Sequence, residues 1–165
     1  MQQGQTNELN FPMTYPNDFE ERELTTIQEA LGILEARIKK GDAFTNPADV
    51  KNYCRLQLAN ELDEYFSCMF LDSGHRLLQY ERLFRGTVDG AAVYPRVVVR
   101  RALELNAAAV IFTHNHPSGR AEPSHADINI TTRLKEALAL VDVRVLDHII
   151  VSTEDTYSMA EHGRI

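Results

Sequence analysis

Apolar residues recur every three or four positions in four stretches of the chain, a spacing that predicts amphipathic helices. The first helix is expected from Thr26, where Thr26-x-x-Glu29 resembles a capping box, to a stop at Gly41. The second is expected to begin at Asn46-Pro47, because an N-cap residue is followed by a proline that suits a first helical turn. Its predicted inward stripe contains Val50, Cys54, Leu58 and Leu62.

The third predicted helix opens at Pro95 and ends near Asn106, a residue that suits a C-terminal cap. The fourth is expected from Ser124 to Val141, and residues 143–151 then alternate between apolar and polar as a strand does. The inward residues of the fourth helix are expected to be Ile130, Leu134, Leu138 and Val141.

Three further segments have the composition of strands. Strand formers are concentrated in residues 65–71, and Asp72-Ser73-Gly74 supplies a turn from which residues 76–84 can return as the paired strand. The run from Ala107 to Phe112 is wholly apolar and ends at His114, which suits a central strand covered on both faces. The order helix, helix, hairpin, helix, strand, helix, strand predicts an α+β fold or an α/β sandwich.

The chain has 165 residues, of which 44% are apolar and 25% charged, so one domain with a hydrophobic core is expected. No apolar run approaches the ~20 residues that a membrane span requires, so no membrane partner is expected. The polar N-terminus does not have the layout of a secretory signal, and residues 1–20 are interpreted as a flexible tail. The two cysteines, Cys54 and Cys68, suit the core of a cytoplasmic protein better than a disulfide scaffold.

The formal net charge of −7 argues against broad, non-specific binding to nucleic acid, which requires a basic face. A small basic patch could still form from Arg96, Arg100 and Arg101. Alternatively, these three arginines form a solvated face of the third helix. Charge therefore leaves a DNA partner open, with weak support.

The residues that suggest chemistry lie between positions 114 and 127. His114 and His116 flank one residue, and alternate side chains of an extended segment point to the same face, so both imidazoles can reach one ion. Asp127 follows one turn into the next predicted helix. Three protein ligands with one open position are typical of a catalytic zinc site.

Each part of this stretch also has an ordinary structural explanation. Ser124-x-x-Asp127 is a usual helix start, with a serine N-cap and an acid in the first turn. Residues 115–119 could form just a tight loop. Both the capping and the ligand interpretation of Asp127 stay open on these grounds.

The stretch also resembles a known family. The spacing His-x-His, seven residues, Ser, two residues, Asp is the JAMM motif of the JAB/JAMM (MPN) metalloprotease superfamily, and the chain matches it throughout. The surrounding sequence is similar to the RadC branch of that superfamily over residues 47–165. The similar segments are Phe84-Arg85-Gly86-Thr87, Tyr94-Pro95-Arg96, residues 102–109, His114-Asn115-His116-Pro117-Ser118-Gly119 and Leu146-Asp147-His148-Ile149-Ile150.

The resemblance implies a JAB/MPN-like mixed β-sheet flanked by helices at residues 47–165, with residues 21–46 as an N-terminal helical extension. Longer RadC proteins carry a helix-hairpin-helix segment before the catalytic domain, and residues 1–46 do not resemble one, which indicates a short-form member. One position departs from the family. RadC-like proteins usually carry an acid directly after the Pro-Arg pair, where this chain has Val97, and a change in local packing or in a substrate contact is expected there.

In this family two histidines and an aspartate bind one zinc ion, and a water molecule fills the fourth position. A glutamate polarises that water, and a serine helps to hold the oxyanion. Carried over by the motif, one Zn²⁺ is assigned to His114, His116 and Asp127. The oxyanion contact is assigned to Ser124.

The family's glutamate lies outside the motif and is placed by topology at the start of the first hairpin strand. Glu64 fits that position, and Glu81 in the returning strand is the alternative. Either could instead be a solvent-facing strand glutamate. His148, beside Asp147, could contact a metal ligand or the substrate, or it could be a hydrogen-bonded structural histidine.

The predicted function is that of a zinc-dependent hydrolase, a metallopeptidase or isopeptidase whose partner is a peptide, isopeptide or other amide substrate. The alternatives are a DNA-repair-associated nucleic-acid-binding module and a metal-dependent nuclease. Specificity is expected in the loops at 86–94 and 117–123, and the sequence sets neither the substrate nor the oligomeric state.

Overall fold

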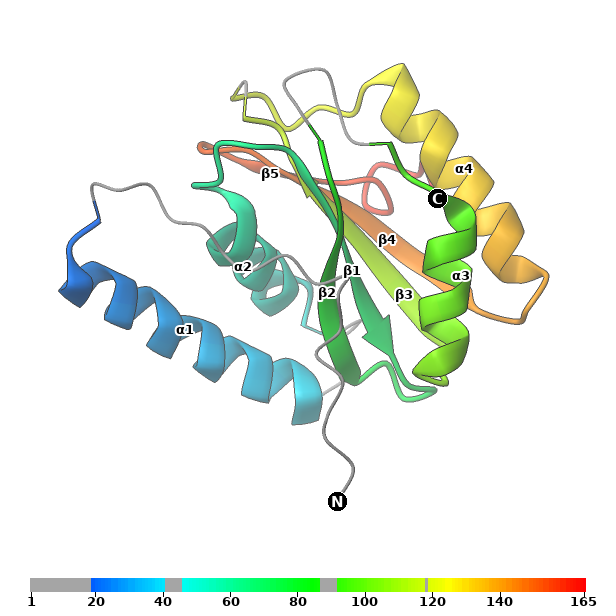
Figure 1. Cartoon of the computed structure of the whole chain (residues 1–165), viewed down its shortest axis with the longest axis horizontal. Coiled ribbons are helices and arrows are strands. Elements are labelled where there is room, and N and C mark those ends of the chain that lie inside the picture. Colours follow the sequence, from blue (N-terminus) through cyan, green and yellow to red (C-terminus); the bar gives the residue numbers. More distant parts are fainter. Residues whose placement is uncertain (1–18, 41–45, 87–91, 118) are drawn as a thin grey trace.

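One mixed sheet lies between two pairs of helices in the computed structural model, which describes residues 19–40, 46–86, 92–117 and 119–165 (Figure 1). The predicted α+β class, with helices flanking a mixed sheet, is confirmed. Most of the predicted tail, residues 1–18, lies outside the described residues. In chain order the elements are α1 (Glu21–Lys40), α2 (Pro47–Leu58), β1 (Tyr65–Leu71), β2 (Leu77–Arg85), α3 (Pro95–Glu104), β3 (Ala109–Asn115), α4 (His125–Ala139), β4 (Arg144–Val151) and β5 (Thr156–Ser158).

The strand order in the sheet is β2-β1-β3-β4-β5. Neighbouring strands run antiparallel except β3 and β4, which are parallel and are joined through α4. A parallel pair needs such a crossover, whereas the antiparallel β1 and β2 need only a tight turn. β3 is therefore central and lies between an antiparallel and a parallel neighbour. The carboxyl ends of strands in such sheets are a common location for ligand sites.

Alternation of side chains along the strands divides the interior into two layers. One layer, which includes Met69, packs α1 and α2 against the sheet, and the other, which includes Phe66 and Phe112, packs α3 and α4 against the opposite face (Figure 1). β3 is buried along its whole length, as predicted for a strand covered on both faces. Cys54 and Cys68 are buried with free thiols, as predicted for core residues, and they lie in different layers.

Helix α1 begins at Glu21 rather than at Thr26. The Thr26 hydroxyl donates to a backbone carbonyl inside the helix, so the predicted capping box at Thr26 was wrong. The Glu20 N–H instead donates to the Glu23 carboxylate, which satisfies a donor at the true helix start. The predicted stop at Gly41 lies outside the described residues. Neither α1 nor any other described helix is long and apolar enough to cross a membrane.

Helix α2 begins at Pro47 after Asn46, as predicted, but it ends at Leu58. Leu62 was predicted to continue the buried stripe, and this prediction was wrong, because Leu62 is 80% exposed. The chain turns after Leu58, and Glu61 enters the interior instead. The segment that leads into β1 is therefore held by a charged group and not by an apolar one.

A buried ion pair fixes this segment. The Arg82 guanidinium donates to the Glu61 carboxylate at 2.8 Å and to the Gln57 carbonyl, and both charged side chains are at most 4% exposed. The same guanidinium lies over the Tyr65 ring, 4.8 Å from its centroid. Arg82 thus ties the end of α2 to β2 and holds the residues that precede β1 between them.

Arg82→Ala should destabilise the protein by about 3–5 kcal/mol, because the buried Glu61 carboxylate would lose the guanidinium that faces it. Arg85→Ala is the matched control, since Arg85 lies in the same strand and pairs with Asp63 at the surface. Urea unfolding should show a large fall in midpoint for Arg82→Ala and almost none for Arg85→Ala. Equal falls would contradict a special role for the buried pair.

Candidate metal centre

Three side chains that can ligate a metal converge at the carboxyl end of β3. His114 lies in β3, His116 follows the strand directly, and Asp127 lies in the first turn of α4. One ligand atom from each lies within 4.8 Å of the others. The two histidine Nε2 atoms are 2.8 Å apart, and the Asp127 oxygens lie 3.2 Å from Nε2 of His114 and 3.3 Å from Nε2 of His116. The structure therefore brings together the three residues that the motif singled out as ligands.

The sheet and a tight turn place the two imidazoles. His114 stands opposite Phe66 of β1, and the two rings stack. The His116 N–H donates to a carbonyl of β4, so the extended path continues beyond β3 and both histidines keep the same side. Gly119, with a φ of 97°, accommodates the turn that brings the Arg120 carbonyl back to His116.

The Asp127 carboxylate serves the start of α4 and the cluster at the same time. Its Oδ2 accepts from the N–H and the hydroxyl of Ser124, each at 2.7 Å, while the Asp127 N–H donates to the Ser124 oxygen. This is a capping box with aspartate in place of the usual glutamate. The capping and ligand interpretations of Asp127 are thus compatible, since Oδ1 faces His114 while Oδ2 caps the helix.

Hydrogen bonds on the far side of the rings orient the histidines. Nδ1 of His116 lies 2.8 Å from the Arg120 carbonyl, which can only accept, so Nδ1 carries a hydrogen and, in the neutral ring, Nε2 carries a lone pair. Nδ1 of His114 faces a ring nitrogen of His148 instead. Imidazole nitrogens and a carboxylate that meet in this way suit zinc and other divalent transition metals. The residues present therefore fit a metal ion.

The pKa values reflect the crowding of the cluster. Burial disfavours the ionised Asp127, but hydrogen bonds from the two histidines and Ser124 outweigh it and hold the Asp127 pKa well below its usual range. The hydrogen bond with Asp127 raises the pKa of His116, against the effect of burial. For His148, desolvation first and the charge of His114 second lower the pKa far below the ordinary value. A positive charge is therefore favoured beside Asp127, while His148 stays neutral.

Glu64 lies on the histidine side of the sheet. Phe66 pairs with His114 and faces the layer of α3 and α4, so the side chain two residues earlier points to the same face. Continuing this register by two residues sets Glu64 opposite His116. The pKa of His116 is raised first by Asp127 and, more weakly, by the negative charge of Glu64. Glu64 is half-buried and borders the cluster.

Glu81, the alternative glutamate, is engaged elsewhere. It is fully buried, and both of its carboxylate oxygens pair with Arg101 of α3. A solvent-facing position for Glu81 was therefore wrong. Its strand partner is Cys68, which places it nearer the middle of the sheet than Glu64.

The same ion pair corrects the prediction of a solvated arginine face. Arg96 and Arg100 are exposed, but the Arg101 side chain is only 12% exposed and pairs with Glu81 and Glu104. Arg100 also lies 3.8 Å from Glu104. Acidic partners therefore offset part of the positive charge of α3.

Asn115, which the sequence patterns did not single out, holds the backbone on both sides of Glu64. Its Oδ1 accepts from the Tyr65 N–H and its Nδ2 donates to the Asp63 carbonyl, each at 2.8 Å. The Glu64 carbonyl itself accepts from the Gly86 N–H. An asparagine at the end of an apolar strand could have indicated this role, because a buried amide requires hydrogen-bond partners.

His148 reaches the cluster from β4. Its Nε2 lies 2.8 Å from Nδ1 of His114, and its Nδ1 lies 2.6 Å from the hydroxyl of Thr131 in α4. The Phe66 and Phe112 rings both pack against it in edge-to-face geometry. The structure places His148 in direct contact with a candidate ligand, whereas Thr131 was missed because its sequence context is that of an ordinary helical residue.

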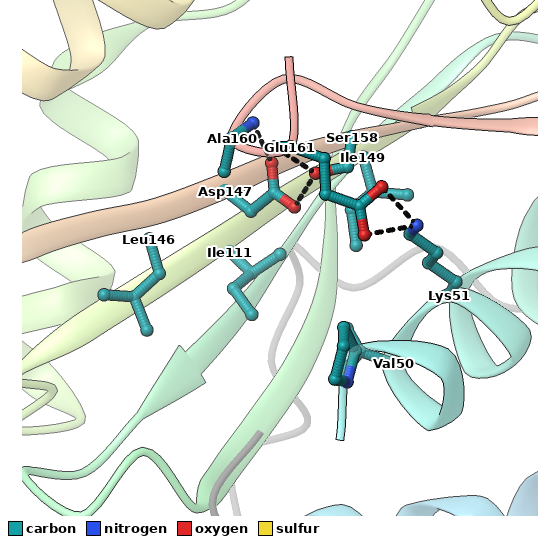
Figure 2. A pocket seen from close by; sticks show the side chains of 10 residues that line it. Val50, Lys51, Ile111, Leu146, Asp147, Ile149, Ser158, Ala160 and Glu161 are labelled. Carbon is teal, nitrogen blue, oxygen red and sulfur yellow. Dashed lines mark hydrogen bonds and ion pairs between the residues drawn. The ribbon is translucent and has the colours of Figure 1, made fainter. Parts of the chain in front are cut away.

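A cavity of about 290 Å³ lies on the opposite face of the sheet, between α2 and β4 (Figure 2). Its walls include Val50 and Ile111, and at its edge Lys51 pairs with Glu161. The three residues of the metal cluster are not among those that line it. The cavity is therefore separate from the cluster.

Comparison with known proteins agrees with the motifs. A family model described as RadC-like JAB domain matches residues 44–164. Similar proteins are named UPF0758: one from Marinobacter nauticus is 54% identical over 137 residues, 83% of this chain and 61% of that protein. One from Stutzerimonas stutzeri is 58% identical over 130 residues, 79% of this chain and 58% of that protein. One from Vibrio cholerae is 53% identical over 137 residues, 83% of this chain and 86% of that protein. The chain thus spans less than two thirds of the length of the first two relatives.

The cluster should bind one divalent transition metal ion, and binding should raise the unfolding temperature, because the ion stabilises the folded state. At a hundredfold excess over Kd, Co²⁺ or Zn²⁺ should contribute about 2.7 kcal/mol. Thermal unfolding of chelator-treated protein, with and without added metal, measures the effect. His116→Ala should abolish the stabilisation, and His125→Ala, at an exposed position at the start of α4, should retain it. An equal shift in both variants would place the bound ion elsewhere.

Proposed function

The chain belongs to the RadC-like JAB domain family, and we propose that it is a zinc-dependent hydrolase that cleaves an amide or isopeptide bond. The observation that carries the proposal is the meeting of two imidazoles and a carboxylate at the carboxyl end of the central strand β3, with a second carboxylate beside them. Three ligands leave one position open to water, as in catalytic zinc sites. The chain spans only part of the length of several relatives, so the activity of the whole protein is also proposed and not shown by the comparison.

Bound zinc would supply Lewis acidity, which lowers the pKa of a water molecule toward ~7 and polarises an amide carbonyl. Glu64 accepts a proton from the attacking water and delivers it to the departing amine, since an amide nitrogen leaves poorly without a proton. The Ser124 hydroxyl donates to Asp127 in this structure, and by turning it can donate to the oxyanion of the substrate.

Proton transfer needs a carboxylate that is held in place. Asn115 binds the backbone on both sides of Glu64, and Gly86 binds its carbonyl. Glu81 is unsuited to the same role, because both of its oxygens pair with Arg101. The location of these two glutamates thus supports Glu64 as the proton carrier.

A DNA-binding module and a metal-dependent nuclease have less support. DNA binding needs a basic face, but the net charge is −7 and Arg101 is turned toward acidic partners. A two-metal nuclease holds its ions about 3.5–4 Å apart, and the described part of the chain offers one group of three ligands. Amide hydrolysis needs one metal ion and one proton carrier. The three candidate ligands can hold one ion, and Glu64 can carry the proton.

Glu64→Gln should lower the rate of hydrolysis at least about a hundredfold while zinc binding is kept, because the amide cannot accept a proton and the ligands are unchanged. Zinc-loaded wild type and variant would be assayed on a panel of peptide and isopeptide substrates, with zinc content measured on the same samples. Glu136→Gln, the same change on the exposed face of α4, is the matched control and should match wild type.

Two outcomes would count against a peptidase. In the first, zinc-loaded wild type cleaves every substrate of the panel no faster than Glu64→Gln does. In the second, cleavage survives both Glu64→Gln and His116→Ala, which would point to a contaminating hydrolase. Cleavage of plasmid DNA that is lost in His116→Ala would support the nuclease instead.

A further inference from the structure

A continuous chain of hydrogen bonds connects two residues of the metal cluster through buried side chains. The Thr131 hydroxyl oxygen lies 2.6 Å from the Asp127 carbonyl and 2.6 Å from Nδ1 of His148. On the other side of the same ring, Nε2 of His148 lies 2.8 Å from Nδ1 of His114. The hydrogen-bond chain therefore runs from the backbone carbonyl of Asp127 to the imidazole of His114. The two residues between them, Thr131 and His148, are both buried.

The direction of each hydrogen bond follows from the end of this chain. A carbonyl oxygen can only accept, so the Thr131 hydroxyl donates its one hydrogen to Asp127. Its oxygen must then accept from His148, which places the hydrogen on Nδ1 of that ring and leaves a lone pair on Nε2. This lone pair accepts from Nδ1 of His114, so in the neutral form of the His114 ring Nε2 carries the lone pair that faces the cluster. The reverse direction would set two oxygen lone pairs against each other at 2.6 Å.

We propose that Thr131 and His148 are positioning residues that lock His114 in the tautomer whose Nε2 can ligate a metal ion. The inference rests on the proposed metal site and deepens it. The Arg120 carbonyl holds His116 in the corresponding tautomer. Helix α4 thus contributes the carboxylate of Asp127 and, one turn later, the hydroxyl that orients another ligand.

The carboxylate of Asp147, the sequence neighbour of His148, does not set this tautomer. It lies on the opposite face, where Oδ2 accepts from the Ser158 hydroxyl and Oδ1 from the Ala160 N–H (Figure 2). It meets His148 through the backbone N–H and not through the ring.

Thr131→Val removes the hydroxyl with little change in shape. The hydrogen on Nδ1 of His148 then loses its acceptor, and the tautomer with the hydrogen on Nε2 becomes accessible. His114 would in that case present a protonated Nε2 to the metal. Zinc affinity at neutral pH, measured by competition with a chromophoric chelator, should fall about 10- to 100-fold. Thr131→Ser keeps the hydroxyl and should bind zinc as wild type does.

Thr132→Val is the matched control. The Thr132 hydroxyl donates to the Ile128 carbonyl at 3.0 Å, the same bond one residue along α4, but it is exposed. Its loss should leave zinc affinity unchanged. Equal affinities of folded Thr131→Val and Thr132→Val would overturn the proposal, and so would a loss of affinity in Thr131→Ser.

A second measurement tests the hydrogen-bond chain without metal. Two-bond ¹H–¹⁵N spectra of metal-free wild type should show the hydrogen of His148 on Nδ1 and a lone pair on Nε2. The opposite tautomer would overturn the proposal even if Thr131→Val did not fold. Neither readout uses hydrolysis. A failed substrate screen would therefore count against the proposed function but not against this inference. An unchanged zinc affinity of Thr131→Val would count against this inference but not against the proposed function.

Discussion

The site depends on keeping three electron-rich groups, those of His114, His116 and Asp127, within about hydrogen-bonding distance of one another. Such groups repel unless a positive charge lies between them, and each must be held from behind. A buried histidine holds the first, a backbone carbonyl the second and a helix cap the third. These supports orient the three groups toward one another, which lowers the cost of organising the ligands when a metal binds.

The first turn of α4 carries most of this organisation. Oδ1 of Asp127 faces His114, while Oδ2 caps the helix and also lies beside His116. The positive end of the helix dipole further favours an anionic group at this position. A change at Asp127 would therefore disturb the helix start and the cluster together, and both consequences have one physical cause.

Two buried glutamates near the sheet have a structural role. Glu61 pairs with Arg82 and Glu81 pairs with Arg101, so these two buried carboxylates hold strand β2 to the helices beside it. Burial of a charge is tolerated when it is paired in this way. Glu64 directly precedes β1, is half-buried and borders the metal cluster. The same type of residue thus has a structural place at two positions and a candidate chemical one at the third.

The sequence by itself determined which segments form helices and strands and which residues could ligate a metal. Apolar periodicity and the His-x-His spacing are local properties of the sequence, so they can be recognised without knowledge of the fold. The burial of Leu62 was predicted wrongly because a helix end depends on the turn that follows it. Only the tertiary structure decided that Glu64 borders the cluster while Glu81 does not, and that Thr131 meets His148. Those contacts join different elements through strand register and helix packing, for which a single sequence contains no periodic signal.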